Sequence, residues 1–521
     1  MKLNDMDKDW DVVIAGGGIT GAGIFVEAVL QGFKTLLVEQ QDFAWGTSSR
    51  SSKLVHGGLR YLKQGKLNLT LQSVRERQRL LASESGLISP LQFYMPVYKH
   101  HGPSRQMMNI GLSLYSLMAM KKQHRQWSPQ EAAGHWPFVN SMDMTAGFSF
   151  MDAQTDDARL VLKLIAQGQS LGGTALNYTT LCEVGRDNRG RARAVVLQDT
   201  EYGTTLDVTA GVVINATGAW ADKLQPFPAK GYQLRPLRGS HLVFPGNLFP
   251  GRDAVSVCHP NDNRPVFILP WEGSTLVGTT DMDHEESLAK EPSISHKEAG
   301  YLMEAIRFAT PGLNLREQDC IGSFAGVRPV LSRGKASASN ESREHLILET
   351  NGLITITGGK LTTFRQVALD VLKIARRCLK HQSESMPYQG SKIENRVDEE
   401  SGITSDLPPD IHLRLLGRYG PATASTIEAA TDHSQPNVPG TQTLWSEIVY
   451  AAENEQVRHL SDLMLRRVRV GLVMAHGGST LLDRVQEVCS PFLSWDKPRW
   501  ETEKQIYRKT WQNFYSSPFA G

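Results

Sequence analysis

A glycine-rich turn near the N-terminus constrains the fold more than any other feature of this sequence. Residues 11–15 (DVVIA) are apolar and rich in β-branched side chains, which predicts a strand. Gly16, Gly18 and Gly21 follow in G-x-G-x-x-G spacing and open a predicted helix. Residues 34–39 (KTLLVE) predict a second strand. Strand, turn, helix and strand fit a βαβ unit of about 30 residues, which indicates an α/β fold.

Each glycine of this turn has a distinct physical role in a dinucleotide site. The first permits the tight turn, the second lets the backbone approach a pyrophosphate, and the third lets the helix pack closely on the strand. The pyrophosphate then lies at the helix N-terminus, where free N–H groups and the dipole favour an anion. Glu39 ends the second predicted strand, where a carboxylate accepts from a ribose hydroxyl. The alternative is a glycine-rich turn in an unrelated α/β domain.

Two later segments favour FAD over NAD, a choice that the turn alone does not settle. Residues 212–222 (VVINATGAWAD) and 353–366 (LITITGGKLTTFRQ) each predict a strand that ends in a glycine turn. A late segment that returns to the first βαβ unit suits an extended ligand, and its helix N-terminus suits an anionic flavin ring. Plain sheet core is the alternative for either segment. The candidate FAD contacts here are Thr217, Gly218, Gly359 and Thr362.

The stretch at residues 46–62 (GTSSRSSKLVHGGLRYL) is unusually polar for a segment that follows such a turn. Its hydroxyl groups suit a pyrophosphate near the helix N-terminus, and its cations add positive charge. A solvated basic loop is the alternative. The hydroxyl residues are Thr47, Ser48, Ser49 and Ser52, and the basic residues are Lys53, His56 and Arg60.

Composition argues against several other classes of protein. Lys and Arg number 56 against 54 Asp and Glu, so no nucleic-acid partner is expected and anion binding must be local. The five cysteines include no C-x-x-C pair, which argues against an iron–sulfur cluster and favours a reducing, cytoplasmic compartment. We expect neither a secretory signal nor a membrane-spanning helix, since no apolar run reaches about 18 residues. No metal site is predicted.

The C-terminal part of the chain differs in pattern from the rest. Residues 381–410 are polar, contain prolines and lack apolar periodicity, which predicts a linker. Helical patterns follow, so a separate helical domain is expected over 411–521.

Eight motifs carry a resemblance to a known family. In order, they are GGGITGAG, TSSRSSKLVHGGLRYL, DDARLV, NATGAWAD, RGSHLVFP, GTTD, GVRPV and TGGKLTTFR. From about residue 9 to the C-terminal region, the sequence resembles the FAD-dependent glycerol-3-phosphate dehydrogenases of the aerobic, quinone-linked type. The resemblance implies oxidation of sn-glycerol 3-phosphate to dihydroxyacetone phosphate, with hydride transfer to FAD and electron transfer to a membrane quinone.

The resemblance also implies a domain organisation. An α/β fold is expected, with a Rossmann-like FAD-binding domain, an antiparallel-sheet substrate (cap) domain and a C-terminal helical domain. Residues 1–380 would form the FAD-dependent oxidoreductase region. Its FAD-binding parts are expected at about 9–85, 150–235 and 320–380, and its cap parts at about 86–149 and 236–319.

Three residues are candidates for catalysis. Arg328 in GVRP matches the family's active-site arginine and is expected to anchor the substrate; a pKa above about 12 makes it a poor base. His241 in RGSH is the better base, because its unperturbed pKa lies near neutrality, although a structural histidine is the alternative. Lys360 begins a predicted helix, where a cation is unfavourable unless an anion is bound. By resemblance, it lies near the flavin and the substrate phosphate.

Further substrate contacts rest on the resemblance alone. Arg60, Tyr61 and Arg343 are expected to join Arg328 and Lys360 around the substrate. The sequence around Arg343 (ASASNESREH) departs from the family pattern, so this position has less support than the others.

Residues 105–125 (RQMMNIGLSLYSLMAMKKQHR) predict a helix that lies in a membrane interface. The apolar stretch is too short to span a bilayer, and basic residues flank it. Asn109, Ser113 and Ser116 form a narrow polar stripe. A buried core helix is the alternative, but the family's peripheral membrane binding favours the inner face of the cytoplasmic membrane. The basic run at 465–471 (LRRVRVG) is a second candidate for lipid contact, or else a solvated helix end.

Other functions stay open at this stage. An FAD-dependent amine or amino-acid oxidase of similar architecture would use an arginine to bind a carboxylate. A glycerol-3-phosphate oxidase would pass its electrons to oxygen, and a regulatory flavoprotein would lack turnover. The cations of the motifs favour a phosphate substrate over a carboxylate. The sequence does not determine the oligomeric state, and a homodimer is one option.

Overall fold

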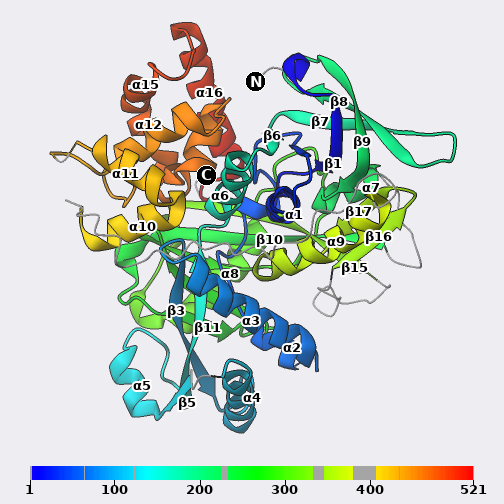
Figure 1. The fold of residues 1–521 in the computed structure, drawn as a ribbon. Helices are drawn as coiled ribbons and strands as arrows, with labels where there is room; N and C mark the ends of the chain where they lie inside the picture. The colour runs from blue at the N-terminus through cyan, green and yellow to red at the C-terminus, as the bar shows by residue number, and fades with distance from the viewer. Residues whose placement is uncertain are drawn as a thin grey trace.

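The computed structural model describes residues 3–63, 65–120, 124–224, 233–332, 345–379, 407–432 and 434–519. Two sheets form the body of the oxidoreductase region, and helices from the C-terminal part of the chain pack beside them (Figure 1). The predicted βαβ unit is observed at the centre of the first sheet.

The first sheet has a parallel centre. β1 pairs in parallel with β2 on one side and with β9 on the other, and β6 and β17 continue the sheet outward. β1 and β2 consist largely of buried apolar residues, as strands covered on both faces require. The parallel strands are β1 (Asp9–Ala15), β2 (Thr35–Val38), β6 (Thr174–Leu176), β9 (Thr205–Asn215) and β17 (Leu353–Thr357). The antiparallel additions are β7 (Thr179–Arg186), β8 (Ala192–Asp199) and β16 (Leu346–Thr350).

Helices distant in sequence pack together on this sheet. α1 contacts both α6 and α9, so the early, middle and late parts of the chain meet at one place. They are α1 (Ile19–Leu30), α6 (Asp157–Ser170) and α9 (Phe364–Leu379). The three predicted FAD-binding parts therefore each contribute to one layered unit.

The second sheet is largely antiparallel and contains most of the predicted cap. Its strand order is β14-β10-β13-β12-β11-β3-β5-β4, and β15 also pairs with β10. The strands are β3 (Ile88–Tyr98), β4 (His124–Trp127), β5 (Met144–Thr155), β10 (Gln233–Pro245), β11 (Ala254–Cys258), β12 (Pro265–Trp271), β13 (Ser274–Gly278), β14 (Met282–Asp283) and β15 (Gly322–Ser332). The helices of this region are α2 (Leu59–Lys63), α3 (Leu67–Ser83), α4 (Arg105–Met118), α5 (Pro129–His135) and α8 (His296–Ala309).

Two strands extend the second sheet past the predicted cap boundaries. β5 continues to Thr155, although residues from about 150 were expected in the FAD-binding part. β15 pairs with β10 from Gly322 to Ser332, although residues from about 320 were expected there as well. The physical reason is long antiparallel pairing, of β5 with β3 as far as Thr155 and of β15 with β10 from Gly322 to Ser332.

The C-terminal helices share a hydrophobic core with the second sheet. One cluster of buried side chains runs from Phe93 and Phe324 in the sheet to Ile448, Leu463 and Trp500 in the helices. The expected helices are therefore present, but they pack on the oxidoreductase region. They include α10 (Pro409–Tyr419), α11 (Pro421–Ala429), α12 (Trp445–Asn454), α13 (Leu460–Asp462), α14 (Val470–Val473), α15 (Leu482–Cys489) and α16 (Lys497–Phe514). Most of the predicted linker at 381–410 lies outside the described residues.

The basic run at 465–471 is buried, so the predicted lipid contact is wrong. Arg466 and Arg467 both donate to Asp42, which lies just beyond the first βαβ unit. Burial opposes the ionisation of Asp42, but the two guanidinium groups outweigh it and lower the pKa of this carboxyl. The run resembled an exposed helix end because its acidic partner lies more than 400 residues away in the sequence.

Candidate active site

A cavity of about 1360 Å³ is lined by residues of both sheets. This volume exceeds the roughly 300–1,000 Å³ of typical small-molecule sites, so the cavity has room for an extended dinucleotide beside a small substrate. Ten of the predicted FAD contacts line it, namely Gly16, Gly18, Glu39, Thr47, Ser48, Ser52, Thr217, Gly218, Gly359 and Thr362.

The glycine turn fits against its surroundings with no space for side chains. Gly16 has φ +112°, and a Cβ there would lie 2.6 Å from the carbonyl oxygen of Ala216. A Cβ at Gly21 would lie 1.8 Å from the carbonyl oxygen of Gly16. Gly21 therefore packs beneath the turn, and Gly18 forms the N-cap of α1 at the cavity surface. This is the close helix–strand contact predicted from the sequence.

Two side chains support the N-terminus of α1. Ser48 Oγ accepts from the N–H of Ile19 at 2.9 Å, and Glu39 Oε2 accepts from the N–H of Gly17 at 2.7 Å. Burial raises the pKa of Glu39, although the N–H groups of Gln41 and Gly17 counteract this by donating to the carboxylate. Glu39 directly follows β2 and lines the cavity, where it can accept from a ribose hydroxyl.

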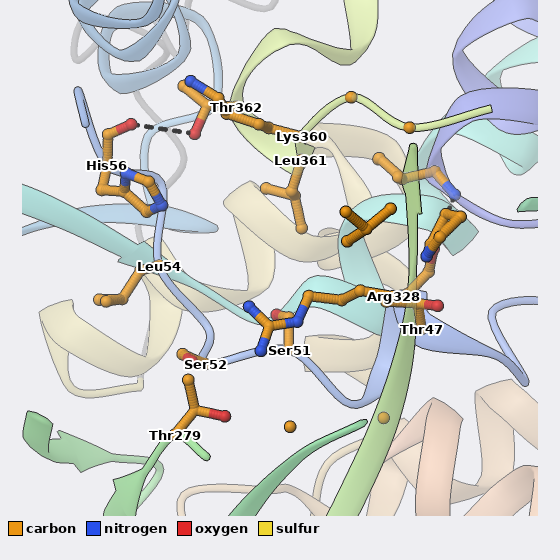
Figure 2. A pocket seen from close by; sticks show the side chains of 18 of the residues that line it. Thr47, Ser51, Ser52, Leu54, His56, Thr279, Arg328, Lys360, Leu361 and Thr362 are labelled. Carbon is orange, nitrogen blue, oxygen red and sulfur yellow. Dashed lines mark hydrogen bonds between the residues drawn. The ribbon is translucent and has the colours of Figure 1, made fainter. Parts of the chain in front are cut away.

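The two later glycine segments meet across the cavity floor. β9 and β17 are paired in parallel, so Thr217 and Gly218 come close to the turn that contains Gly359. Thr357 Oγ1 donates to the carbonyl oxygen of Gly218 at 3.2 Å. Thr362 Oγ1 donates to the carbonyl oxygen of His56 at 3.3 Å, which joins the late turn to the polar stretch at 46–62 (Figure 2).

Arg328 extends from β15 into the cavity. Figure 2 shows its guanidinium group pointing toward Ser52 and Thr279. Nη2 donates to the carbonyl oxygen of Thr280 at 3.1 Å and to Asp281 Oδ1 at 3.2 Å. A Cβ at Gly239 would lie only 2.8 Å from this nitrogen, so a glycine there leaves room for the guanidinium group.

His241 is buried beside the same part of the cavity. Its Nε2 lies 2.9 Å from Ser52 Oγ, and its ring stacks on Phe324 with the centroids 4.6 Å apart. Burial, together with the positive charges of Lys53 and Arg328, holds the pKa of His241 well below its ordinary value. The imidazole is therefore neutral at pH 7.

Lys360 and Tyr61 lie together on the cavity wall. Lys360 Nζ lies 3.6 Å from the centroid of the Tyr61 ring and donates to Ser73 Oγ at 2.9 Å. Both residues line the cavity, and their contact with the substrate stays a prediction. The side chain of Arg60 and the whole of Arg343 lie outside the described part of the chain.

Lys53 does not contribute charge to the cavity surface. Its Nζ is buried and donates to the carbonyl oxygen of Ser49 at 2.6 Å and to Asp157 Oδ1 at 2.9 Å. The expectation that it would support a phosphate is therefore wrong. The sequence could not show this, because Asp157 is 104 residues away.

Arg264 and Asp281 belong to the site but were not predicted. Both line the cavity, and Arg264 Nη2 lies 3.3 Å from Asp281 Oδ2. Asp281 thus lies between Arg264 and Arg328 and orients both guanidinium groups. Asp281 is the last residue of the GTTD motif, so the motif could have identified it as a site residue. No pattern in the sequence singles out Arg264.

α4 has two apolar faces, which reconciles the two interpretations of the segment 105–125. Met108, Leu112 and Tyr115 are buried, as in a core helix. The opposite face exposes a stripe at helical spacing, which consists of Met107, Ile110, Leu114 and Leu117. Several residues of both faces also line the cavity, namely Met107, Met108, Ile110, Leu112 and Leu114. Ser116 is not part of an exposed polar stripe, because it is buried and lies 2.7 Å from His124 Nδ1.

The cavity surface fits FAD. The N-terminus of α1 faces the cavity through Gly18, Ile19 and Thr20, which suits a pyrophosphate. Thr47 and Ser48 add hydroxyl groups beside it. The late glycine turn and Arg328 line the same cavity, so one cavity offers surfaces for both the dinucleotide and a small anionic substrate.

Two family descriptions match the chain. Residues 11–365 match the family described as FAD dependent oxidoreductase, and residues 381–500 match the C-terminal domain of alpha-glycerophosphate oxidase. The protein is thus an FAD-dependent oxidoreductase with a glycerophosphate oxidase-type C-terminal domain. The predicted cofactor and fold class are confirmed.

Individual relatives define the family more closely. The chain is 33% identical over 492 residues to the aerobic glycerol-3-phosphate dehydrogenase of Staphylococcus haemolyticus, with 90% of this chain and 88% of that protein covered. It is 32% identical over 523 residues to the Bacillus subtilis enzyme of the same name, with coverage of 95% and 93%. The FAD complex of the Bacillus halodurans glycerol-3-phosphate dehydrogenase has a TM-score of 0.76 and 25% identity, and covers 99% of this chain and 97% of that chain. The chain belongs to the family of aerobic glycerol-3-phosphate dehydrogenases, as its motifs predicted.

The glycine turn yields a direct test of the FAD site. Gly21→Ala is expected to abolish FAD binding, because the added Cβ would clash with the backbone of Gly16. Gly300→Ala in α8 is the matched control, since a Cβ there meets nothing within 4 Å. The measurement is flavin absorbance per mole of purified protein, with far-UV circular dichroism to verify folding. A folded Gly21→Ala protein with a full complement of FAD would contradict this assignment.

Proposed function

We propose that this chain oxidises sn-glycerol 3-phosphate to dihydroxyacetone phosphate and passes the electrons to a membrane quinone. The observation that carries the proposal is a single cavity that joins the dinucleotide turn to Arg328, Lys360 and a neutral His241. When bound, FAD supplies the hydride acceptor. The chain's own residues must bind the phosphate, orient the C2 hydroxyl and accept its proton.

Phosphate binding is assigned to the cationic end of the cavity. Arg328 is oriented by Thr280 and Asp281, and a guanidinium fork suits bidentate contacts to phosphate. The contact of Lys360 with the Tyr61 ring stabilises the ammonium group without neutralising its charge. Two cations on one cavity favour a dianionic phosphate over the single carboxylate of an amino acid, which weakens the amino-acid oxidase alternative.

Proton removal is assigned to His241. Ser52 lines the cavity and is hydrogen-bonded to Nε2, so it can relay a proton from the substrate hydroxyl to the imidazole. The positive charges of Lys53 and Arg328 help to keep the free imidazole neutral. A bound dianionic phosphate would counter these charges and raise the pKa of His241, which strengthens it as a base when the substrate is present.

Membrane attachment is assigned to the exposed face of α4. Ile110 and Leu117 are 70% and 74% exposed, an unusual state for large apolar side chains on one helix face. No helix in the described part of the chain is long and apolar enough to cross a membrane. An interfacial helix would instead place the protein on the inner face of the cytoplasmic membrane, where quinone dissolves in the lipid.

An anaerobic titration tests the overall function. Addition of sn-glycerol 3-phosphate to the purified holoenzyme is expected to bleach the visible flavin band, and a soluble quinone should restore it. The measurement is absorbance under argon, with glycerol as the unphosphorylated control. A flavin that stays oxidised would reject the substrate, and a reduced flavin that only oxygen reoxidises would favour the oxidase alternative.

The pH dependence of flavin reduction tests His241. Because its pKa is lowered, the imidazole stays neutral as the pH falls from 8 to about 6.5 and is protonated only at more acidic pH. The reduction rate at low substrate concentration, which reports the free enzyme, should therefore fall only on the acidic side. His241→Gln, which can still bond to Ser52 but cannot accept the proton, should lose about 10²- to 10⁴-fold in rate. Near-normal reduction by this variant would show that His241 is structural.

Substitutions on α4 test the membrane assignment. Leu117→Lys on α4 combined with Met120→Lys, two residues past its end, should weaken binding to vesicles of uncharged phosphatidylcholine lipids and slow reduction of a long-chain quinone in them, because charged groups replace apolar side chains. Activity with a water-soluble dye should be unchanged, since neither residue lines the cavity. Tyr202→Lys, at a 79% exposed position in the β8–β9 hairpin, is the matched control. Equal vesicle binding by both variants would reject α4 as the membrane contact.

A further inference from the structure

One segment forms a continuous part of the cavity wall. All residues of the segment 45–52 except Ser49 line the cavity, and this segment is called the wall segment below. Ser48 in its middle caps α1, and Ser52 at its end bonds to His241. The conformation of the wall segment therefore affects both the cofactor end and the catalytic end of the cavity.

The wall segment is held between two strained residues. Ala44 and Lys53 flank it, and both have φ +61°, in the left-handed region that residues other than glycine rarely adopt. Such conformations persist only where the surrounding structure enforces them. The contacts on the outer side of the wall segment, away from the cavity, should therefore show what holds the backbone of this segment in place.

The first outer contact comes from the C-terminal region. Arg469 Nη2 donates to the carbonyl oxygen of Ser49 at 2.8 Å and lies 3.3 Å from Asp157 Oδ1. Arg469 is buried and has φ +62°, so it is itself held in an unfavourable backbone conformation. Its guanidinium group thus anchors the one residue of the wall segment that faces away from the cavity.

The second outer contact comes from the end of α16. Arg50, which lines the cavity, donates from Nη2 to the hydroxyl of Tyr515 at 2.9 Å. Tyr515 in turn donates to Glu291 Oε1 at 3.2 Å, and Arg50 forms an ion pair with Glu291. All three groups are buried or nearly so, where such charge-assisted bonds are strong. The Tyr515 hydroxyl therefore fixes the position of a cavity residue.

We propose that the C-terminal helical region is a structural part of the FAD site, in which Arg469 and Tyr515 are positioning residues. They hold the wall segment from outside, through the carbonyl group of Ser49 and the side chain of Arg50, so that Ser48 and Ser52 keep their bonds to α1 and His241. The proposal rests on the FAD dependence of the proposed function and is independent of the identity of the substrate.

Two tyrosine substitutions of equal size test this. Tyr515→Phe removes the hydroxyl that binds Arg50. Tyr507→Phe, also on α16, removes a buried hydroxyl that donates to Gly477 within the C-terminal region itself. The measurements are the dissociation constant of FAD from each full-length apoprotein, by quenching of flavin fluorescence, and the visible circular dichroism of the bound flavin. The melting temperatures of both apoproteins show how much stability the protein loses when a buried hydroxyl is removed, apart from any effect on FAD binding.

The two variants are expected to differ. Tyr515→Phe should weaken FAD binding about tenfold and alter the flavin spectrum, whereas Tyr507→Phe should stay within about twofold of the wild type. Equal effects of both variants, in proportion to their loss of thermal stability, would overturn the proposal, as would unchanged binding by Tyr515→Phe. If the wild type binds FAD but is not reduced by sn-glycerol 3-phosphate, the proposed substrate fails, while the comparison of the two variants remains decisive.

Discussion

The close approach of α1 to β1 is the contact on which the rest of the site depends. The space that a side chain at Gly21 would fill is occupied by the carbonyl oxygen of Gly16. This short distance between helix and strand brings the N-terminus of α1 to the carboxyl edge of the parallel sheet, where its free N–H groups face the cavity. β9 and β17 then end beside it, because parallel strands terminate at a common edge. The second sheet closes the opposite side and supplies Arg328 and His241.

The catalytic end of the cavity is organised by charge. Asp281 lies between Arg264 and Arg328 and orients both, so the cluster keeps a net positive charge that a dianionic ligand can complement. The same positive surroundings disfavour protonation of His241. A neutral imidazole and fixed cations in one cavity are the conditions under which binding of the phosphate and acceptance of a proton support each other.

Local patterns predicted much of the fold and of the site, since the glycine turn and its flanking elements are contiguous in sequence. The motifs predicted the family, and most of the predicted site residues line the cavity. The errors have a common physical cause. Lys53 and Arg467 were each assigned from their own neighbours in the sequence, but each is buried against a partner more than 100 residues away. Long antiparallel pairing likewise placed β15 in the second sheet. Hydrogen-bonding partners distant in sequence leave no local signal.

The two faces of α4 bear on how electrons would leave the proposed site. Met108 and Leu112 line the cavity from within, while Ile110 and Leu117 are exposed on the other side of the same helix. Because Met107, Ile110 and Leu114 are exposed and also line the cavity, a quinone headgroup at this face of α4 would lie at the cavity itself. Substrate and quinone would then use different parts of one cavity wall, the first lined by Arg328 and Lys360 and the second by apolar side chains of α4. That arrangement keeps a charged, water-borne substrate apart from an apolar acceptor without a second protein.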